Sequence, residues 1–265
     1  FQECLQAVWF TFIGIQMEAY ERCFGCGRLD QYAYPFLKAD LDAGRITEAQ
    51  AQEILDCFWM KFPETNYINT EHHSQIASGF PAQQQIMVGG QTPDGKDASN
   101  LLSYMCLQSA MNTLLHQPSI SFRYFEGTPD SLVAQACRLA RKGAGHPSFF
   151  NDGRCIPALV YKGIPLEDAR DYSSVGCAGI LPTRKDKGTH NAGYLNVASP
   201  LEFALHDGYW KKGGKQVSIH TGDPRQFKTF QDVMDAYEKQ LAYLIKVYSA
   251  EIIKVEQAHK ELCPT

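Results

Sequence analysis

The sequence contains no apolar run as long as the roughly 18 residues that a membrane-spanning helix requires. The nearest candidate, Leu5–Ile15, is too short and includes Gln6. The sequence also lacks a secretory leader and an excess of positive charge, since its formal net charge is −4. A protein without a basic surface has little attraction for nucleic acid or anionic lipid. These absences favour a cytoplasmic protein with neither a nucleic-acid partner nor a membrane partner.

The sequence also lacks the cysteine spacing of a disulfide framework or a zinc site. Its 9 cysteines are scattered, and without a secretory leader they indicate a reducing compartment. Cys23 and Cys26 form a single CxxC pair, which supplies only two of the about four ligands of a structural zinc ion. His72 and His73 lie far away in the sequence. We therefore expect no bound metal, and we expect most cysteines to be small buried residues.

What the sequence does contain is an ordinary globular composition with alternating helix and strand patterns. Apolar residues make up 44% and charged residues 20% of the 265 residues, which allows a substantial buried core. The patterns predict helices at 1–24, 35–43, 48–62, about 100–115, 129–141, 165–170, 199–206 and 229–261, and strands at 86–90, 119–125, 149–150 and 156–161. Short strands that alternate with helices predict the α/β class.

Local signals predict where several of these elements begin. Thr47 with Gln50, and Ser199 with Glu202, match the capping-box pattern. Asp97 or Ser99 is expected to cap the helix that ends near residue 115, and Thr128 the helix that follows Pro129. The segment 151–154, Asn-Asp-Gly-Arg, is expected to be a polar turn.

The stretch Asp171–Ile180 places one cysteine, Cys177, among small residues. Glycine and alanine on both sides allow the backbone or a ligand to come close to the sulfur. From these residues alone, Cys177 is either a small residue in a tightly packed turn or a reactive thiol. A thiolate mechanism would need a base, for which His190 is the nearest candidate in the sequence. No cysteine–histidine protease or transferase motif surrounds the pair.

Many stretches match a single enzyme superfamily. They are Gly145–Asp152, Gly163–Tyr172, Gly176-Cys177, Gly188–Asn196 and Leu201–Leu205, and nearer the start Gly27–Gln31, Tyr34–Phe36, Gly44–Thr47, Val88–Gly90 and Asp94-Gly95. With these residues the sequence resembles the glycyl radical enzymes, the superfamily of pyruvate formate-lyase and glycerol dehydratase. The resemblance covers nearly the whole chain, and its matches around the cysteine are specific.

The resemblance implies a radical lyase or transferase of anaerobic metabolism. In the family, a glycyl radical near the C-terminus takes a hydrogen atom from the loop cysteine, and the resulting thiyl radical abstracts hydrogen from a small organic substrate. Cys177 matches that cysteine, and His190 and Asn191 fall where some relatives contact substrate. No cofactor is bound in the family. A radical S-adenosylmethionine iron–sulfur activating enzyme installs the radical, the enzymes form homodimers, and the fold is a ten-stranded α/β barrel.

The sequence departs from the family pattern at several places. The radical-glycine motif, Arg-Val-x-Gly followed by an aromatic residue, does not occur in it. We therefore expect residues 1–265 to be a partial domain, an internal fragment without the N-terminal part and the C-terminal glycyl radical domain, and inactive alone. Pyruvate formate-lyase has two adjacent cysteines, whereas Gly176 precedes Cys177 here, and this difference disfavours pyruvate formate-lyase itself.

Two further departures concern the reaction. Many members carry a glutamate two residues after the cysteine as a base in dehydration, and here that position is Gly179. Asn191 stands where dehydratases have an aspartate. These changes favour C–C bond chemistry, either of the fumarate-adding kind or of the formate-lyase kind. The alternative is a non-catalytic paralogue or truncated product that keeps the fold as a structural or interaction protein. Arg123, Glu126 and His116 could line the barrel, but the sequence does not select them.

Overall fold

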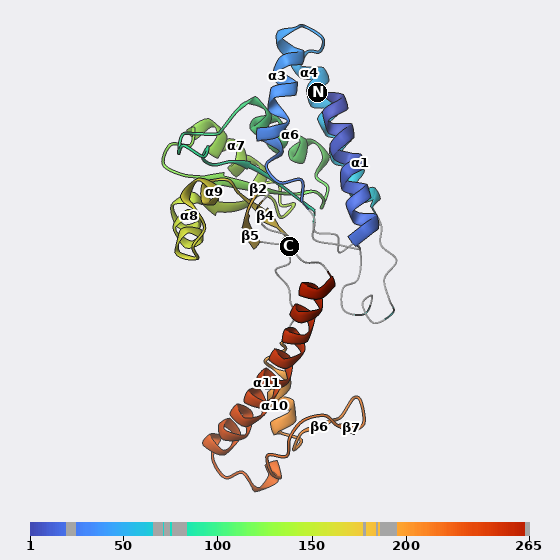
Figure 1. Cartoon of the computed structure of the whole chain (residues 1–265), viewed down its shortest axis with the longest axis vertical. Coiled ribbons are helices and arrows are strands. Elements are labelled where there is room, and N and C mark those ends of the chain that lie inside the picture. Colours follow the sequence, from blue (N-terminus) through green and yellow to red (C-terminus); the bar gives the residue numbers. More distant parts are fainter. Residues whose placement is uncertain are drawn as a thin grey trace. The chain divides into compact units, whose positions relative to one another are not determined.

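The computed structural model describes residues 1–19, 25–65, 71, 75, 84–176, 179–183, 185 and 195–262. They belong to two units, Phe1–Gly188 and Thr189–Thr265, each with its own internal contacts. Figure 1 labels the helices and strands of both units.

A parallel three-stranded sheet is the central element of the first unit. Its strands are β1 (Gln85–Gly89), β2 (Ser119–Tyr124) and β3 (Ser148–Asn151), in the order β1-β2-β3. Each connection contains a helix, first α6 (Leu101–Thr113) and then α7 (Asp130–Ala140), because parallel neighbours need a crossover. The expected α/β class is confirmed. The ten strands of the expected barrel are not seen in the described residues, which form one three-stranded sheet and two two-stranded sheets.

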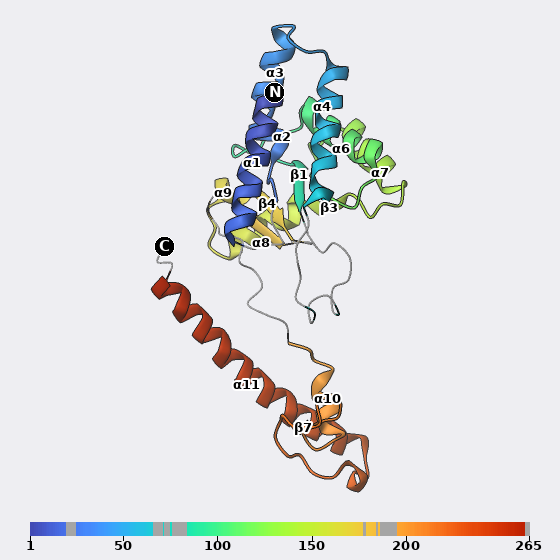
Figure 2. The same ribbon diagram turned by 90° about the vertical axis from the view of Figure 1, so that its right-hand side faces the viewer.

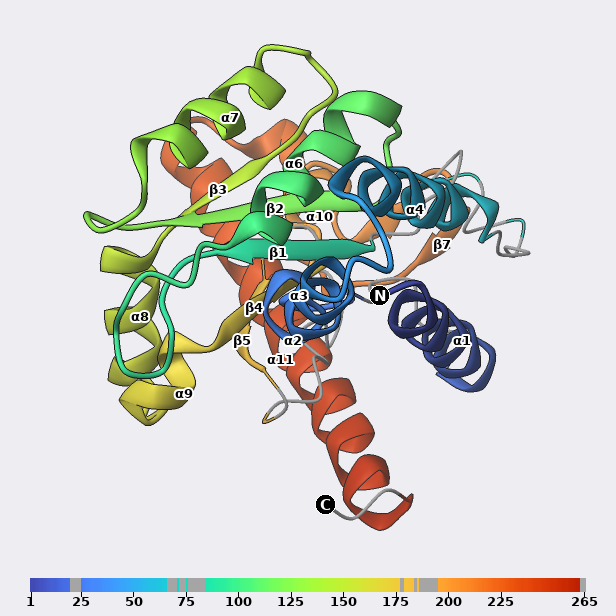
Figure 3. The same cartoon turned by 90° about the horizontal axis from the view of Figure 1, so that it is seen from above.

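The two faces of this sheet differ in character, because successive side chains of a strand point to opposite sides. Ile86, Val88 and Phe122 belong to the larger hydrophobic core, and α6 and α7 cover that face in Figure 3. Met87 belongs to a second, smaller core together with Phe150. On this second face Figure 3 shows a two-stranded hairpin, β4 (Tyr172–Val175) and β5 (Gly179–Pro182), with helices α8 (Asp152–Tyr161) and α9 (Leu166–Arg170).

Aromatic side chains hold the helical layer together. Helix α1 (Gln2–Ala19) lies beside α4 (Glu48–Lys61), as Figure 2 shows. The ring of Trp9 lies 5.6 Å from that of Phe62, and the ring of Phe12 lies 5.4 Å from the same ring, both edge to face. The remaining short helices of this layer are α2 (Leu29–Tyr32), α3 (Tyr34–Asp42) and η1 (Phe62–Glu64).

The strand predicted at 156–161 and the turn predicted at 151–154 are both wrong. These residues form helix α8, capped by Asn151, whose side-chain oxygen accepts a hydrogen bond from the Gly153 N–H at 2.9 Å. The apolar run looked like a buried strand, but its buried residues are Ile156 and Leu159, three positions apart on one helical face. Pro157 lies inside the helix, where a sequence pattern predicts a break.

Three of the expected caps are also wrong. Asn100, not Asp97 or Ser99, caps α6, and its side chain accepts from the Leu102 N–H at 2.9 Å. Thr128 closes the turn before α7 by accepting from the Phe125 N–H, while Pro129 occupies the cap position. The predicted box at Ser199 does not form, because α10 (Ser199–Ala204) begins after Ala198 without a side-chain cap. The capping box at Thr47 is confirmed.

The second unit consists of one long helix and several short elements. Helix α11 (Phe230–Leu262) packs against α10, as Figure 1 shows. A hairpin of β6 (Tyr209–Trp210) and β7 (Lys215–Gln216) and the short helix η2 (Pro224–Gln226) complete it. The buried side chain of Gln240 on α11 donates to the Ile219 carbonyl at 2.7 Å and also bonds Ser218, which fixes the loop to the helix. None of the helices in the described part of the chain is both long and apolar enough to cross a membrane.

We predict that Asn100→Ala lowers the free energy of unfolding by about 1–2 kcal/mol, because α6 loses its N-cap. The Asn100 side chain also donates to the Asp30 carbonyl at 2.8 Å. Ser99→Ala is the matched control and should change stability by less than about 0.5 kcal/mol. Urea unfolding measures both, and equal losses would contradict the assignment of Asn100 as the cap.

Candidate active site

The segment around Cys177 is an antiparallel hairpin. The register of β4 and β5 runs from Tyr172 opposite Pro182 to Val175 opposite Gly179. Three residues, 176–178, therefore connect the last paired residues, and the first of them, Gly176, has a φ of 60°. Glycine is the residue best suited to that backbone angle. Cys177 itself lies outside the described residues, as do Cys23, His190 and Asn191, so none of these sequence predictions is tested.

A buried arginine on β2 holds the base of the hairpin. The Arg123 side chain is fully buried and donates from Nε and Nη2 to the two carboxylate oxygens of Asp152, both at 2.9 Å. It also donates to the main-chain carbonyls of Arg170 at 2.7 Å and Tyr172 at 2.9 Å. We call Arg123, Asp152 and Tyr172 the hairpin brace. It connects the first residue of β4 to the middle of the sheet and to the start of α8.

The Tyr172 side chain completes the hairpin brace. Its ring lies under the guanidinium group of Arg123, 3.8 Å from ring centroid to Cζ, and its hydroxyl donates to the Asp152 carboxylate at 2.8 Å. Burial, together with the Asp152 charge and hydrogen bond, raises the pKa of Tyr172 well above its ordinary value, although Arg123 opposes the shift. The phenol therefore keeps its proton at neutral pH, so this tyrosine acts as a hydrogen-bond donor and not as a base.

A second arginine, Arg28, binds Asp171, the residue between the carbonyls of Arg170 and Tyr172. Arg28 donates to the Asp171 carboxylate at 2.7 Å and to the Gly89 carbonyl at 3.1 Å. Burial lowers the pKa of Arg28, and the nearby charge of Arg123 lowers it further. The main-chain carbonyl of Asp171 accepts from the Thr183 N–H at 3.0 Å, which closes the hairpin at its open end. Three consecutive residues, 170–172, are thus fixed by two arginines.

Further along, the hairpin lies close to the sheet. The Ser174 hydroxyl bonds the Ser121 hydroxyl at 3.0 Å, and Ser121 donates to the Gln85 side chain at 3.0 Å. All three residues are buried. A Cβ atom on Gly25 would lie 2.8 Å from the Gln85 carbonyl and 3.4 Å from that of Ser174, so a larger residue would not fit between strand and hairpin.

The residues of the hairpin brace were not identified as site residues from the sequence. The sequence does not select Arg123 over Glu126 and His116, and it predicts a turn at Asp152. A signal was present, because Arg123 lies within a strand whose neighbours are apolar, and a buried cation needs an anionic partner. Asp152 directly follows β3, the strand that pairs with β2. The sequence could not show that these two strands are neighbours.

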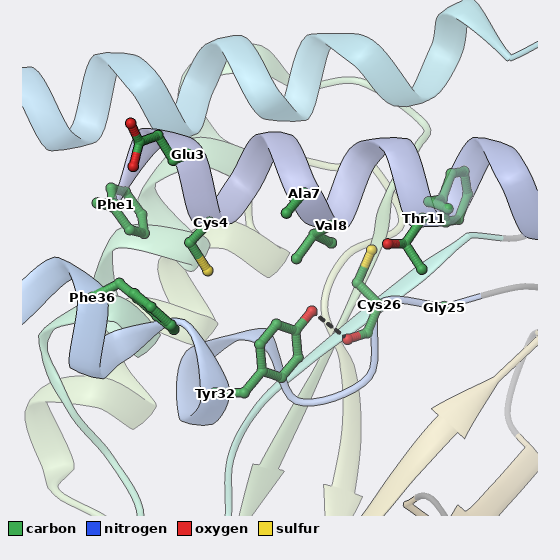
Figure 4. A pocket seen from close by; sticks show the side chains of 11 residues that line it. Phe1, Glu3, Cys4, Ala7, Val8, Thr11, Gly25, Cys26, Tyr32 and Phe36 are labelled. Carbon is green, nitrogen blue, oxygen red and sulfur yellow. Dashed lines mark hydrogen bonds between the residues drawn. The ribbon is translucent and has the colours of Figure 1, made fainter.

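A cavity of about 590 Å³ lies elsewhere, between α1 and the segment around Cys26. Figure 4 shows Cys4 and Val8 of α1 facing Cys26 and Tyr32, whose hydroxyl donates to the Cys26 carbonyl at 2.8 Å. Burial raises the pKa of Cys26 to about 12, so this thiol stays protonated and is unsuited to nucleophilic chemistry. Among the residues that the structure describes, no cluster of histidine, cysteine and carboxylate side chains could hold a metal ion.

Comparison with known proteins gives consistent matches. A family model described as pyruvate formate lyase-like matches residues 1–265. The chain is 36% identical over 258 residues to isethionate sulfite-lyase of Desulfovibrio desulfuricans, covering 96% of this chain and 31% of that protein. It is 34% identical over 254 residues to trans-4-hydroxy-L-proline dehydratase of Clostridioides difficile, covering 93% of this chain and 31% of that protein.

Solved structures agree with these relatives. A structure described for 1,2-propanediol dehydration in Roseburia inulinivorans matches with a TM-score of 0.87 and 36% identity, over 99% of this chain and 33% of that one. The B12-independent glycerol dehydratase from Clostridium butyricum matches with a TM-score of 0.77 and 38% identity, over 91% of this chain and 30% of that one. The chain spans about a third of the length of the curated relatives it matches.

We predict that Gly90→Ala lowers the free energy of unfolding by about 2–4 kcal/mol, because overpacking adds to backbone strain. Gly90 has a φ of +81°, and a Cβ atom there would lie 2.4 Å from Arg123 Nε. Gly143→Ala is the matched control, since its φ of +78° is similar but no atom lies within 4 Å of its Cβ position. That control should lose about 1–2 kcal/mol, the cost of a left-handed backbone for a residue with a Cβ atom, and urea unfolding that shows equal losses would contradict the close contact with Arg123.

Proposed function

This chain belongs to the pyruvate formate lyase-like family of glycyl radical enzymes, and we propose that it carries the radical-relay cysteine, Cys177. The observation that carries the proposal is the hairpin itself. Cys177 lies in the three-residue connection between Val175 and Gly179, and two buried arginines fix the base of that hairpin to the sheet. A rigid support is what a hydrogen-atom relay needs, because the reacting atoms must lie in contact.

The proposed step uses Cys177 twice. Its thiol gives a hydrogen atom to the radical glycine, which becomes an ordinary glycine, and the sulfur becomes a thiyl radical. The thiyl radical then takes a hydrogen atom from a substrate C–H bond, which restores the S–H bond and leaves the radical on substrate carbon. We place the radical glycine on a segment beyond residues 1–265, because its motif does not occur in this sequence.

Partners follow from the same proposal. A radical S-adenosylmethionine iron–sulfur enzyme would install the unpaired electron on that glycine, and the full-length enzyme would form a homodimer.

Each full-length subunit would contain a ten-stranded barrel. The three parallel strands β1–β3 would be part of that barrel, with the hairpin on its inner side. His190 and Asn191 would contact a small organic substrate. Enclosure by the barrel suits a thiyl radical, which must be kept from bulk water.

For the reaction, Gly179 is the informative residue. The relatives include a sulfite-lyase and dehydratases, which favours a lyase. Glycine has no carboxylate, so it cannot take a proton as a base in elimination. We therefore propose a reaction at a C–C bond, either radical addition to fumarate or cleavage of the formate-lyase kind. The competing hypothesis, a non-catalytic paralogue, would be favoured if the full-length protein could not be converted to a radical form.

We predict that Cys177→Ser abolishes turnover in the full-length, activated enzyme, because a hydroxyl O–H bond is too strong to donate its hydrogen atom. The glycyl radical should still form and be visible by EPR. Cys137→Ser, at an exposed cysteine of α7, is the control and should keep wild-type turnover. Turnover by Cys177→Ser would contradict the proposed role of Cys177.

We predict that a substrate panel separates C–C chemistry from elimination. The activated enzyme is incubated with pyruvate, an arylacetate, fumarate plus a hydrocarbon, glycerol and isethionate, and the products are measured by mass spectrometry. Turnover is expected with pyruvate or with fumarate plus hydrocarbon. Gly179→Glu supplies the missing carboxylate and should gain activity on glycerol or isethionate. Rapid elimination by the wild-type enzyme would overturn the C–C assignment.

A further inference from the structure

The hairpin brace controls the main chain of the hairpin and not only its side chains. Arg123 donates to the carbonyls of Arg170 and Tyr172, which lie on either side of Asp171. Its remaining hydrogen bonds go to the Asp152 carboxylate. Together the bonds use Nε, Nη1 and Nη2 of one planar group, so the carboxylate and the two carbonyls must keep a fixed relative arrangement.

The interior position of the hairpin brace makes this arrangement rigid. The side chains of Arg123 and Asp152 are both 0% exposed, and the guanidinium group lies directly against Gly90, where an added Cβ atom would overlap it. The Tyr172 hydroxyl shares one oxygen of Asp152 with Arg123 Nε. The carboxylate therefore fixes the orientation of both neighbours. A lysine at position 123 could keep the charge but not the four bonds.

A small tilt of β4 at Tyr172 displaces the other end of the strand by a distance that grows with the length of the strand. The strand rises about 10 Å over the three steps from Tyr172 to Val175, and Cys177 is two residues farther along the chain. A tilt of about 6° at the base would move the far end of β4 by about 1 Å. A misplacement of about 1 Å at the reacting atoms can slow a reaction about 100-fold.

We propose that Arg123, Asp152 and Tyr172 are positioning residues that set the location of the Cys177 sulfur for hydrogen-atom transfer. The inference rests on the proposed function of Cys177. It adds that a cluster on β2, α8 and the start of β4, which takes no part in the reaction, determines the rate of the radical relay. Loss of a bond in the hairpin brace should slow the relay while the radical glycine still forms.

Hydrogen exchange into the radical glycine tests this without knowledge of the substrate. In D2O the Cys177 thiol becomes S–D and donates deuterium to the glycyl carbon. The thiyl radical then takes the glycine's remaining hydrogen atom, which leaves a deuterated glycyl radical and an S–H group. The EPR doublet of the α-hydrogen collapses as this proceeds. The collapse rate per radical reports the relay, whereas the spin count reports how much enzyme is folded and activated.

Four variants of the full-length, activated enzyme are compared with the wild type, and the first of them, Cys177→Ser, tests the relay itself. Arg123→Lys should slow the collapse at least about tenfold, and Tyr172→Phe, which keeps the ring under the guanidinium group, by about threefold to tenfold. Asp56→Asn is the matched control, because Asp56 accepts bonds from Ser109 and Asn112 between α4 and α6 and does not contact the hairpin brace. It should lower stability and leave the rate per radical within about twofold.

The outcomes separate this inference from the proposed function. Exchange that continues in Cys177→Ser would refute the role of Cys177 itself. Exchange that stops in Cys177→Ser but runs at the wild-type rate in both Arg123→Lys and Tyr172→Phe would refute the positioning role alone. Should Arg123→Lys fail to fold, Tyr172→Phe decides, because it removes a single hydroxyl. A slowed rate with an unchanged spin count supports the inference.

Discussion

The interaction on which the first unit depends is the buried ion pair of Arg123 and Asp152. A buried charged side chain is tolerated only when it has an oppositely charged partner and a full set of hydrogen bonds. Removal of one partner from such a pair typically lowers the free energy of unfolding by about 3–5 kcal/mol. The pair fixes the place where β3 becomes α8, the path of the chain into β4 and the need for a glycine at position 90. Three elements that are separate in the sequence therefore share one electrostatic constraint.

The two faces of the parallel sheet have different tasks. One face carries Ile86, Val88 and Phe122 into a large apolar core, where burial of nonpolar surface supplies most of the stabilisation. The other face carries Ser121 and Arg123, which form hydrogen bonds with Ser174 and Tyr172 of the hairpin. Apolar contacts alone would allow the hairpin to shift along the sheet. Hydrogen bonds to particular carbonyls allow only one position of the hairpin on the sheet. Stability and specificity are therefore divided between opposite sides of the same three strands.

The sequence predicted those parts of the fold that depend on neighbouring residues. The capping box at Thr47, the strands β1 and β2 and the long helix α11 agree with local patterns, and the family assignment is confirmed by the relatives. Helix α8 was missed because Pro157 lies within it. The hairpin brace was missed because its partners are distant in the chain. No local pattern reveals that Arg123 meets a carbonyl 49 residues away, and the position of Cys177 within the site stays a prediction.

The sequence separations within these contacts also bear on how the protein folds. Arg123 and Asp152 are 29 residues apart, and Arg28 and Asp171 are 143 residues apart. Contacts between distant residues form late, since the entropy of closing the intervening loops opposes them. The base of the hairpin can be secured only after β1, β2 and β3 have assembled. A chain with an incomplete sheet would therefore leave Arg170 and Tyr172, at the base of the hairpin, without their hydrogen bonds to Arg123.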